Sequence, residues 1–269
     1  MDDAAARLKQ RQRLTWAAGD YHSVSRQIQG AADALIERLG PGPGDDLLDV
    51  ATGTGNVAVP AAGSGARVTG LDLTPELLAL AGSRADAEQV QVTWVEGDAE
   101  ALPFDDASFD MVASCFGVIF APRHALAAAE LARVTRPGGA VALTAWTPEG
   151  LQGRFFRLLG SRMSPPPPGL GTPLQWGVQE HVRSLLEPHG AVTVEHRSVA
   201  FTHDSLEGWL AESERTLGPL VLARAALEPP AWQQLRSELL ELYRSSDDGG
   251  AAGFSAQAEY LLVTVRIPA

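Results

Sequence analysis

Residues 47–56, LLDVATGTGN, decide the fold. The first four residues form a short apolar run with one acidic residue, Asp49, and turn residues bound it on both sides, which is typical of a buried strand. Gly53 and Gly55 then allow the backbone to bend sharply and allow a ligand to approach where a Cβ atom would collide. The helix that follows offers free N–H groups and the positive end of its dipole. The stretch therefore predicts a strand, a turn and a helix that bind a ligand above the strand end.

The neighbouring sequence repeats this alternation of strand and helix. Parallel strands need crossover connections, and helical segments between strands supply them, so the pattern predicts a parallel sheet. The expected strands are residues 47–50, 67–72, 90–95, 109–114 and 139–145. The expected helices are residues 56–62, 75–86 and 124–135, with mostly loop over 98–108.

The chain changes character after about residue 146. Proline and glycine become frequent, and residues 191–199 and 259–267 alternate well enough to predict two further strands. The expected organisation is an N-terminal helical lid (1–40), a cofactor-binding Rossmann-like core (41–147, completed by the two late strands), and substrate cap insertions (148–190 and 200–257).

Composition limits the classes of function. The chain has 269 residues, 45% of them hydrophobic, and a formal net charge of −12. This acidic balance disfavours nucleic acid and anionic lipid as partners. The single cysteine, Cys115, excludes an intrachain disulfide and a multi-cysteine metal site, and no metal is expected. With no signal-peptide pattern and no apolar run of about 18 residues, we expect a soluble, cytoplasmic protein without membrane insertion. The sequence does not predict the oligomeric state.

Acidic residues mark the ends of three expected strands. Asp49 ends the first strand, Asp72 lies 17 residues after Gly55 at the end of the second, and Asp98 follows the third. Gly53-x-Gly55-x-x-Ala58 also fits a dinucleotide-binding fingerprint. However, a carboxylate at position 49 would repel a pyrophosphate, whereas it suits a ligand that carries an ammonium and a sulfonium.

In this order and spacing, five motifs resemble class I S-adenosylmethionine-dependent methyltransferases, especially the ubiquinone/menaquinone-biosynthesis-like branch of small-molecule enzymes. The resemblance covers roughly residues 15–147. It implies an α/β fold: a doubly wound, Rossmann-like, seven-stranded sheet of order 3-2-1-4-5-7-6, with the last strand antiparallel and helical cap insertions. The motifs are residues 49–55, 70–72, 97–104, 109–110 and 133–139.

The resemblance implies S-adenosylmethionine as cofactor and assigns residues to its methionine part. Asp49 and the backbone around Ala51, Gly53 and Gly55 would hold that part, and Tyr21 resembles the aromatic residue that closes over the cofactor. Ala51 is a departure, because many family members have glycine at this position.

The resemblance also assigns the nucleoside part and the transfer channel. Asp72 would bind the ribose hydroxyls, Leu73 would pack on the adenine, and Asp98 and Ala99 would bind the adenine edge. The residues implied to line the methionine moiety and the methyl-transfer channel are Ser114, Cys115 and Phe116.

No catalytic residue follows from the sequence. Methyl transfer is an in-line displacement from an activated donor, so a base is needed only if the acceptor must lose a proton. The weak candidates for that base are His22, His196 and His203. Each of them also fits a solvent-facing position.

The expected function is methyl transfer to a small, apolar or aromatic, natural-product-like acceptor. The alternative is a protein that binds S-adenosylmethionine without methylating, such as a cofactor-dependent cyclase, a scaffold or a sensor. Large aromatic residues also fill protein cores. The candidates for the substrate pocket are Trp16, His22, Trp146, Trp176 and Trp209.

Overall fold

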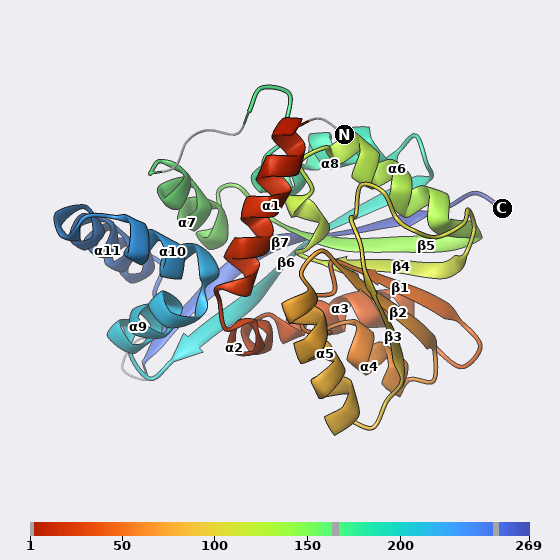
Figure 1. Cartoon of the computed structure of the whole chain (residues 1–269), viewed down its shortest axis with the longest axis horizontal. Helices are drawn as coiled ribbons and strands as arrows, with labels where there is room; N and C mark the ends of the chain where they lie inside the picture. Colours follow the sequence, from red (N-terminus) through yellow and green to blue (C-terminus); the bar gives the residue numbers. More distant parts are fainter. Residues whose placement is uncertain (1–2, 163–166, 250–252) are drawn as a thin grey trace.

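One seven-stranded sheet organises the chain in a computed structural model that describes residues 3–162, 167–249 and 253–269. The strand order is β3-β2-β1-β4-β5-β7-β6. β7 runs antiparallel to both of its neighbours, and the other pairs are parallel (Figure 1). The predicted fold class is thereby confirmed. The strands are β1 (Asp46–Val50), β2 (Arg67–Asp72), β3 (Val92–Glu96), β4 (Phe109–Cys115), β5 (Thr135–Trp146), β6 (Ala191–His203) and β7 (Phe254–Arg266).

Helices cover both faces of this sheet. α3, α4 and α5 lie below it in Figure 1, and α6 and α8 lie above it. A strand covered on both faces is buried along its length, which explains why Leu47, Leu48 and Val50 are apolar and why Asp49 between them is buried as well. These helices are α3 (Gln29–Leu39), α4 (Ala58–Gly63), α5 (Pro75–Ala87), α6 (His124–Val134) and α8 (Gln179–Leu186).

The two late strands are longer than the sequence pattern indicated, and they extend beyond the sheet. β7 pairs with β5 only from Tyr260 to Arg266, whereas it pairs with β6 back to Phe254. The projecting ribbon supports the helices that follow β5 and β6. These helices, at the left of Figure 1, are α7 (Leu151–Gly160), α9 (Leu206–Thr216), α10 (Gly218–Ala226) and α11 (Pro229–Arg244).

The N-terminal helices α1 (Asp3–Ala17) and α2 (Tyr21–Gln27) lie against this structure rather than in the layers of the sheet. α1 packs against α10 and, more sparsely, against α5, so it bridges the sheet and the late helices. Two short 3-10 turns, η1 (Val118–Phe120) and η2 (Pro173–Gly177), contact each other. Within the described ranges, no helix combines the length and the apolar character that crossing a bilayer requires.

A tryptophan fixes the glycine in the second strand. The indole of Trp94, on β3, occupies the space beside Gly70, and a Cβ atom built on Gly70 would lie 2.4 Å from Cζ3 of Trp94. The same indole approaches Gly55 to within 3.3 Å of an equivalent Cβ position. Trp94 therefore supports the loop after β1 from below.

We expect Gly70→Ala to lower the free energy of unfolding by about 1–3 kcal/mol, because the added methyl group would displace a packed ring. Gly63→Ala is the matched control, since it adds a methyl group to a helix end where no atom lies within 4 Å. Urea unfolding of both variants checks the prediction. Equal midpoints for the two variants would contradict it.

Candidate cofactor and acceptor site

The large pocket lies at the carboxyl ends of β1, β2 and β4, with α1 and α2 forming one of its walls. β1 is the strand at which the order of the sheet reverses, since β2 lies on one side of it and β4 on the other. The loops that leave such strands in opposite directions open a crevice where ligands bind in α/β proteins.

The glycine-rich loop shapes the floor of this pocket. Ala51 and Gly53 both have positive φ, at 54° and 56°. A Cβ atom built on Gly53 would meet nothing within 4 Å, so the loop leaves an open side toward the pocket. Gly55 lies outside the lining, and its Cβ position is closed by Val59 and Trp94.

Asp49 is a buried carboxylate beneath this loop. Its Oδ2 accepts hydrogen bonds from the Thr52 hydroxyl at 2.6 Å and from the Ala58 N–H at 3.0 Å. Burial raises the pKa of Asp49 to about 7, and the charge of Asp72 adds to this shift. Both carboxylates line the pocket, so a cationic ligand placed there would relieve the cost of ionising Asp49.

Asp72 joins the loops that follow β1 and β2. Its Oδ2 accepts from the Gly53 N–H and its Oδ1 accepts from the Thr74 N–H, each at 2.8 Å. Burial raises the pKa of Asp72, and these two N–H groups counteract the shift. Each carboxylate oxygen can accept a further hydrogen bond, so the group retains capacity for ligand hydroxyls.

The third carboxylate, Asp98, belongs to the loop after β3. Its Oδ1 accepts from the Glu100 N–H at 2.9 Å and its Oδ2 accepts from Lys9 Nζ at 2.6 Å. With Asp49 and Asp72, it gives the pocket a row of hydrogen-bond acceptors. The ammonium, ribose hydroxyls and adenine amine of S-adenosylmethionine are all donors, so this set fits that cofactor and would repel a pyrophosphate.

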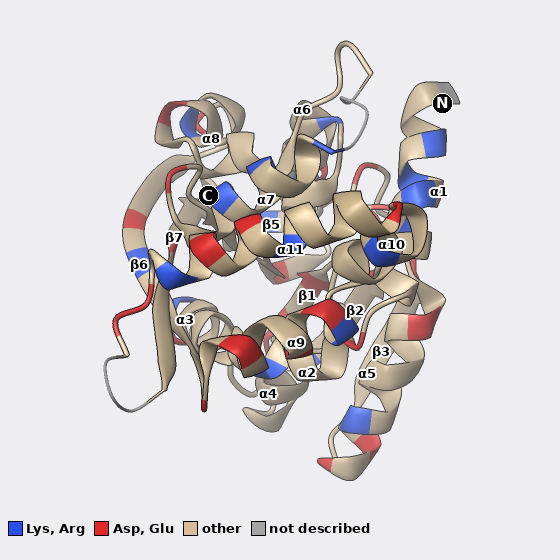
Figure 2. Ribbon diagram, turned by 90° about the vertical axis from the view of Figure 1, so that its left-hand side faces the viewer, with Lys and Arg blue, Asp and Glu red and all other residues tan. Residues whose placement is uncertain are grey.

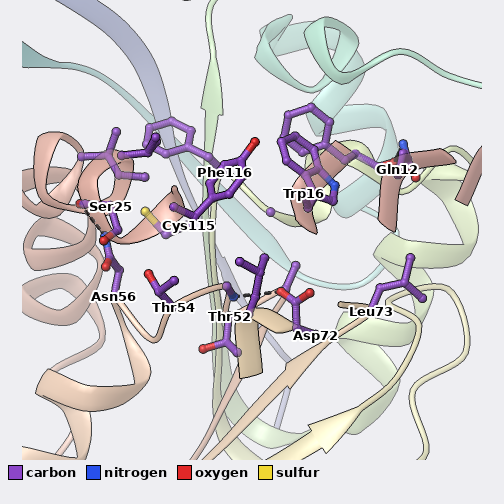
Figure 3. A pocket seen from close by; sticks show the side chains of 18 of the residues that line it. Gln12, Trp16, Ser25, Thr52, Thr54, Asn56, Asp72, Leu73, Cys115 and Phe116 are labelled. Carbon is purple, nitrogen blue, oxygen red and sulfur yellow. Dashed lines mark hydrogen bonds between the residues drawn. The ribbon is translucent and has the colours of Figure 1, made fainter. Parts of the chain in front are cut away.

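Uncharged side chains lie across from this row. Figure 3 shows Thr54, Thr52, Asp72 and Leu73 along one side, and Cys115, Phe116, Trp16 and Gln12 along the other. Phe116 has a positive φ of 55° and stacks on Trp146, with ring centroids 3.6 Å apart. Burial raises the pKa of Cys115 to about 12, so its thiol stays neutral near pH 7.

Aromatic side chains continue the pocket away from the carboxylates. Trp16 packs edge-on against Phe120, with centroids 4.6 Å apart, and Phe201 stacks on Trp209 at 5.2 Å. From Trp146 to the end of the described chain, the only ionisable lining group is the phenol of Tyr243. The lining residues in that span are Trp146, Gln152, Phe155, Phe156, Phe201, Trp209, Leu217, Pro219 and Tyr243.

The structure brings most of the sequence-predicted cofactor residues to this one pocket. Gly55 and Ser114 lie outside its lining. The Ser114 hydroxyl donates to the Val50 carbonyl and accepts from the Val118 N–H, so it joins β1 to the turn after β4. Those that line the pocket are Tyr21, Asp49, Ala51, Gly53, Asp72, Leu73, Asp98, Ala99, Cys115 and Phe116.

The residues predicted for the acceptor divide differently. Trp16, Trp146 and Trp209 line the pocket, whereas Trp176 is fully buried outside it, 5.4 Å from the His124 ring. His22 lines a separate pocket on the surface.

The other two histidine candidates also lie elsewhere. His196 is exposed on β6, and His203 ends that strand 3.5 Å from Glu212. Neither lines the large pocket.

Sequence reasoning missed several lining residues on helices and on the projecting ribbon. Two adjacent phenylalanines on α7, residues 155–156, are the one sequence feature that could have indicated some of these lining residues. Lys9 and Gln12 carried no motif of their own. Lining residues that the sequence did not predict include Lys9, Gln12, Phe120, Phe155, Phe156, Phe201 and Tyr243.

The last family motif supports the sheet instead of the pocket. Arg136 pairs with Asp46 at 2.9 Å and with Asp110 at 2.7 Å, which joins the amino ends of β1 and β4. Arg133 donates to the carbonyls of Leu102 and Phe104 and thereby holds the loop after β3.

Comparisons with known proteins agree with this site. Residues 48–143 match the family model described as a methyltransferase domain. The chain belongs to the class I S-adenosylmethionine-dependent methyltransferases. An uncharacterized protein of Mycobacterium tuberculosis is 37% identical to this chain, over 94% of this chain and 93% of the length of that protein.

Two further similar proteins have names that state an activity. A ubiquinone/menaquinone biosynthesis C-methyltransferase of Ruegeria is 45% identical over 40% of this chain and 44% of its own. A solved structure of the cyclase SpnF is 20% identical, with a TM-score of 0.58, over 90% of this chain and 82% of that one. This second likeness concerns the fold alone.

We expect the affinity for S-adenosylhomocysteine to rise between pH 6 and pH 8. The ammonium group of this ligand favours ionised Asp49, whose pKa of about 7 in the free protein means that binding below that pH releases a proton. Calorimetry at pH 6.5 in buffers of different ionisation enthalpy measures this release. The ammonium of the ligand titrates equally in all variants.

Asp49→Asn is the control for that titration. Its affinity for S-adenosylhomocysteine should be lower than that of wild type, and it should lack the proton release that comes from Asp49. A carboxyl group with a raised folded pKa favours the folded state most at low pH, and this contribution is lost as pH rises toward 7. Without ligand, the Asp49→Asn variant should therefore melt at a higher temperature than wild type at pH 8. Identical proton release in both proteins would refute the assignment.

Proposed function

We propose that the protein transfers the methyl group of S-adenosylmethionine to a small, apolar or aromatic acceptor. One observation carries the proposal: a row of three carboxylates, of which Asp49 and Asp72 are buried and Asp98 is half-buried, shares a single pocket with a chamber of aromatic side chains. The first matches the hydrogen-bond donors of the cofactor, and the second matches an apolar partner placed beside it.

On the cofactor side, the position of each carboxylate supports a role. Asp72 would accept from the ribose hydroxyls while it holds Gly53 and Thr74 in place. Asp49 would bind the methionine ammonium, and Asp98 would bind the adenine amine. The bound cofactor would supply the activated methyl group.

On the acceptor side, the protein positions its substrate and excludes water. Aromatic walls remove the hydration shell of the acceptor, and a displacement needs little else when donor and nucleophile are aligned. The Ruegeria relative matches the cofactor half, and its name refers to ubiquinone and menaquinone biosynthesis, which supports a ring-containing acceptor here.

The wall from Trp146 onward offers no carboxylate, imidazole or ammonium group, within the residues that the structure describes. No described side chain of this wall can therefore remove a proton from the acceptor, so the attacking atom of the acceptor must be nucleophilic without such help. The same feature favours the second candidate function, a cofactor-binding protein that does not methylate, because a wall without a base also suits a cyclase. The fold shared with SpnF is compatible with it.

We expect Asp72→Ala to weaken binding of S-adenosylhomocysteine at least tenfold, since charge-assisted hydrogen bonds to the ribose are each worth roughly 1.5–3 kcal/mol. Asp105→Asn, an exposed change of the same charge, should bind like wild type. Titration calorimetry compares the three proteins. Equal affinity in all of them would rule out Asp72 as the ribose ligand.

Turnover separates the two functions. With S-adenosylmethionine and a panel of phenols, hydroquinones and aromatic amines, the first function predicts release of S-adenosylhomocysteine above the background without acceptor. Phosphoethanolamine, small and highly charged, should give none because burial in an aromatic chamber would desolvate its charges. Tight cofactor binding with no turnover on any acceptor would favour the non-methylating alternative.

A further inference from the structure

A buried ammonium group attaches α1 to the loop after β3. Lys9 Nζ lies 2.6 Å from Asp98 Oδ2 and also pairs with Glu100. Lys9 is 6% exposed and Glu100 is 5% exposed. A buried charge is costly unless it is paired, so the position of this lysine depends on these two carboxylates.

Glu100 has a second cationic partner. Its Oε1 accepts from the Arg123 backbone N–H at 2.5 Å, and its Oε2 accepts from Arg123 Nε at 2.7 Å. Arg123 therefore compensates Glu100 without Lys9. Asp98, by contrast, has Lys9 as its one cationic partner in the ion pairs of the described chain.

Two contacts fix the Asp98 carboxylate. The Glu100 N–H binds Oδ1 at 2.9 Å, while Lys9 binds Oδ2. Because the two donors hold different oxygens, the carboxylate cannot rotate without losing one of them. Both Lys9 and Asp98 line the pocket, so the carboxylate is held at the pocket wall with further lone pairs available.

The same helix continues to the acceptor chamber. Gln12 Nε2 donates to the Phe120 carbonyl at 2.8 Å, and Trp16 packs on the Phe120 ring. Arg13 pairs with Glu96 at 3.1 Å on the outside of the helix. Figure 2 shows Lys and Arg along α1. Two of these basic residues pair with Glu96 at the end of β3 and with Asp98 and Glu100 in the loop that follows it.

We propose that Lys9 is a positioning residue that orients the Asp98 carboxylate toward the adenine amine and couples docking of α1 to adenine recognition. This inference rests on the proposed function, since it takes S-adenosylmethionine as the ligand. Adenine recognition then requires docked α1, and docked α1 brings Trp16 against the acceptor chamber.

The test compares two ligands that differ at the base. S-Adenosylhomocysteine presents an amine to Asp98, whereas S-inosylhomocysteine presents a carbonyl oxygen, which a fixed carboxylate repels. Calorimetry gives the ratio of the two dissociation constants. We expect wild type to prefer the adenosyl ligand by at least tenfold.

Lys9→Met keeps the length of the side chain and removes its charge. We expect it to weaken the adenosyl ligand about tenfold and the inosyl ligand far less, so that the ratio falls to within about threefold of unity. Arg13→Met is the matched control, because it removes a charge from the same helix without touching Asp98. It should retain the wild-type ratio.

Each outcome decides the inference. If Lys9→Met weakens binding of both ligands equally, the ratio is unchanged, Lys9 only docks the helix, and the positioning role is overturned. Unchanged affinity for both ligands overturns it too. Should Lys9→Met fold poorly, Lys9→Met with Glu100→Gln removes one remaining carboxylate charge and serves in its place. If wild type binds no S-adenosylhomocysteine, the proposed function itself fails, which is a distinct result.

Discussion

The hydrogen bonds of the Asp72 carboxylate are the constraint on which the site depends. One carboxylate receives the Gly53 N–H from the loop after β1 and the Thr74 N–H from the loop after β2. In a buried environment such charge-assisted bonds are strong, and losing one leaves an unsatisfied group. The pocket floor and the start of α5 therefore share a single anchor, and ligand hydroxyls would use its remaining lone pairs. The Asp72 side chain therefore holds two loops together and is also the proposed ligand of the ribose.

Two residues with strained backbone conformations line the same pocket. Ala51 and Phe116 both adopt positive φ, which costs a non-glycine residue roughly 1–2 kcal/mol. The strand ends that contain them also approach closely, since a Cβ atom built on Gly117 would lie 2.5 Å from the Cβ of Ala51. Strained residues persist where the surroundings fix them, and they concentrate at functional sites. Alanine at the position where many family members have glycine thus retains the required conformation at an energetic cost.

Local pattern predicted the parts of the molecule that local chemistry determines. The sheet order followed from the resemblance, and Asp49, Asp72 and Asp98 all reach one pocket because the ends of adjacent parallel strands meet at one edge. The start of β5 could not be predicted in this way. The expected strand begins at residue 139, whereas β5 begins at Thr135, and its pairing with β4 shifts between Phe109 and Met111. Lys9 and the phenylalanines of the aromatic chamber were also missed, although Trp16, Trp146 and Trp209 were predicted, because their positions depend on contacts between segments far apart in the chain. Trp176 shows the converse: its residue type suited a pocket, yet the packing of η2 against β5 buries it elsewhere.

The distribution of charge along the pocket has a mechanistic meaning. Asp49, Asp72 and Asp98 line the pocket, while Cys115 and Phe116, the two residues assigned to the transfer channel that also line it, have no charge near neutral pH. A sulfonium loses its positive charge as the methyl group leaves, so a carboxylate beside it would stabilise the ground state more than the transition state. Acidic groups that instead bind the ammonium, the ribose and the adenine would provide affinity without that penalty. Neutral groups at the transfer channel and acidic groups away from it would therefore suit the proposed transfer by alignment and desolvation.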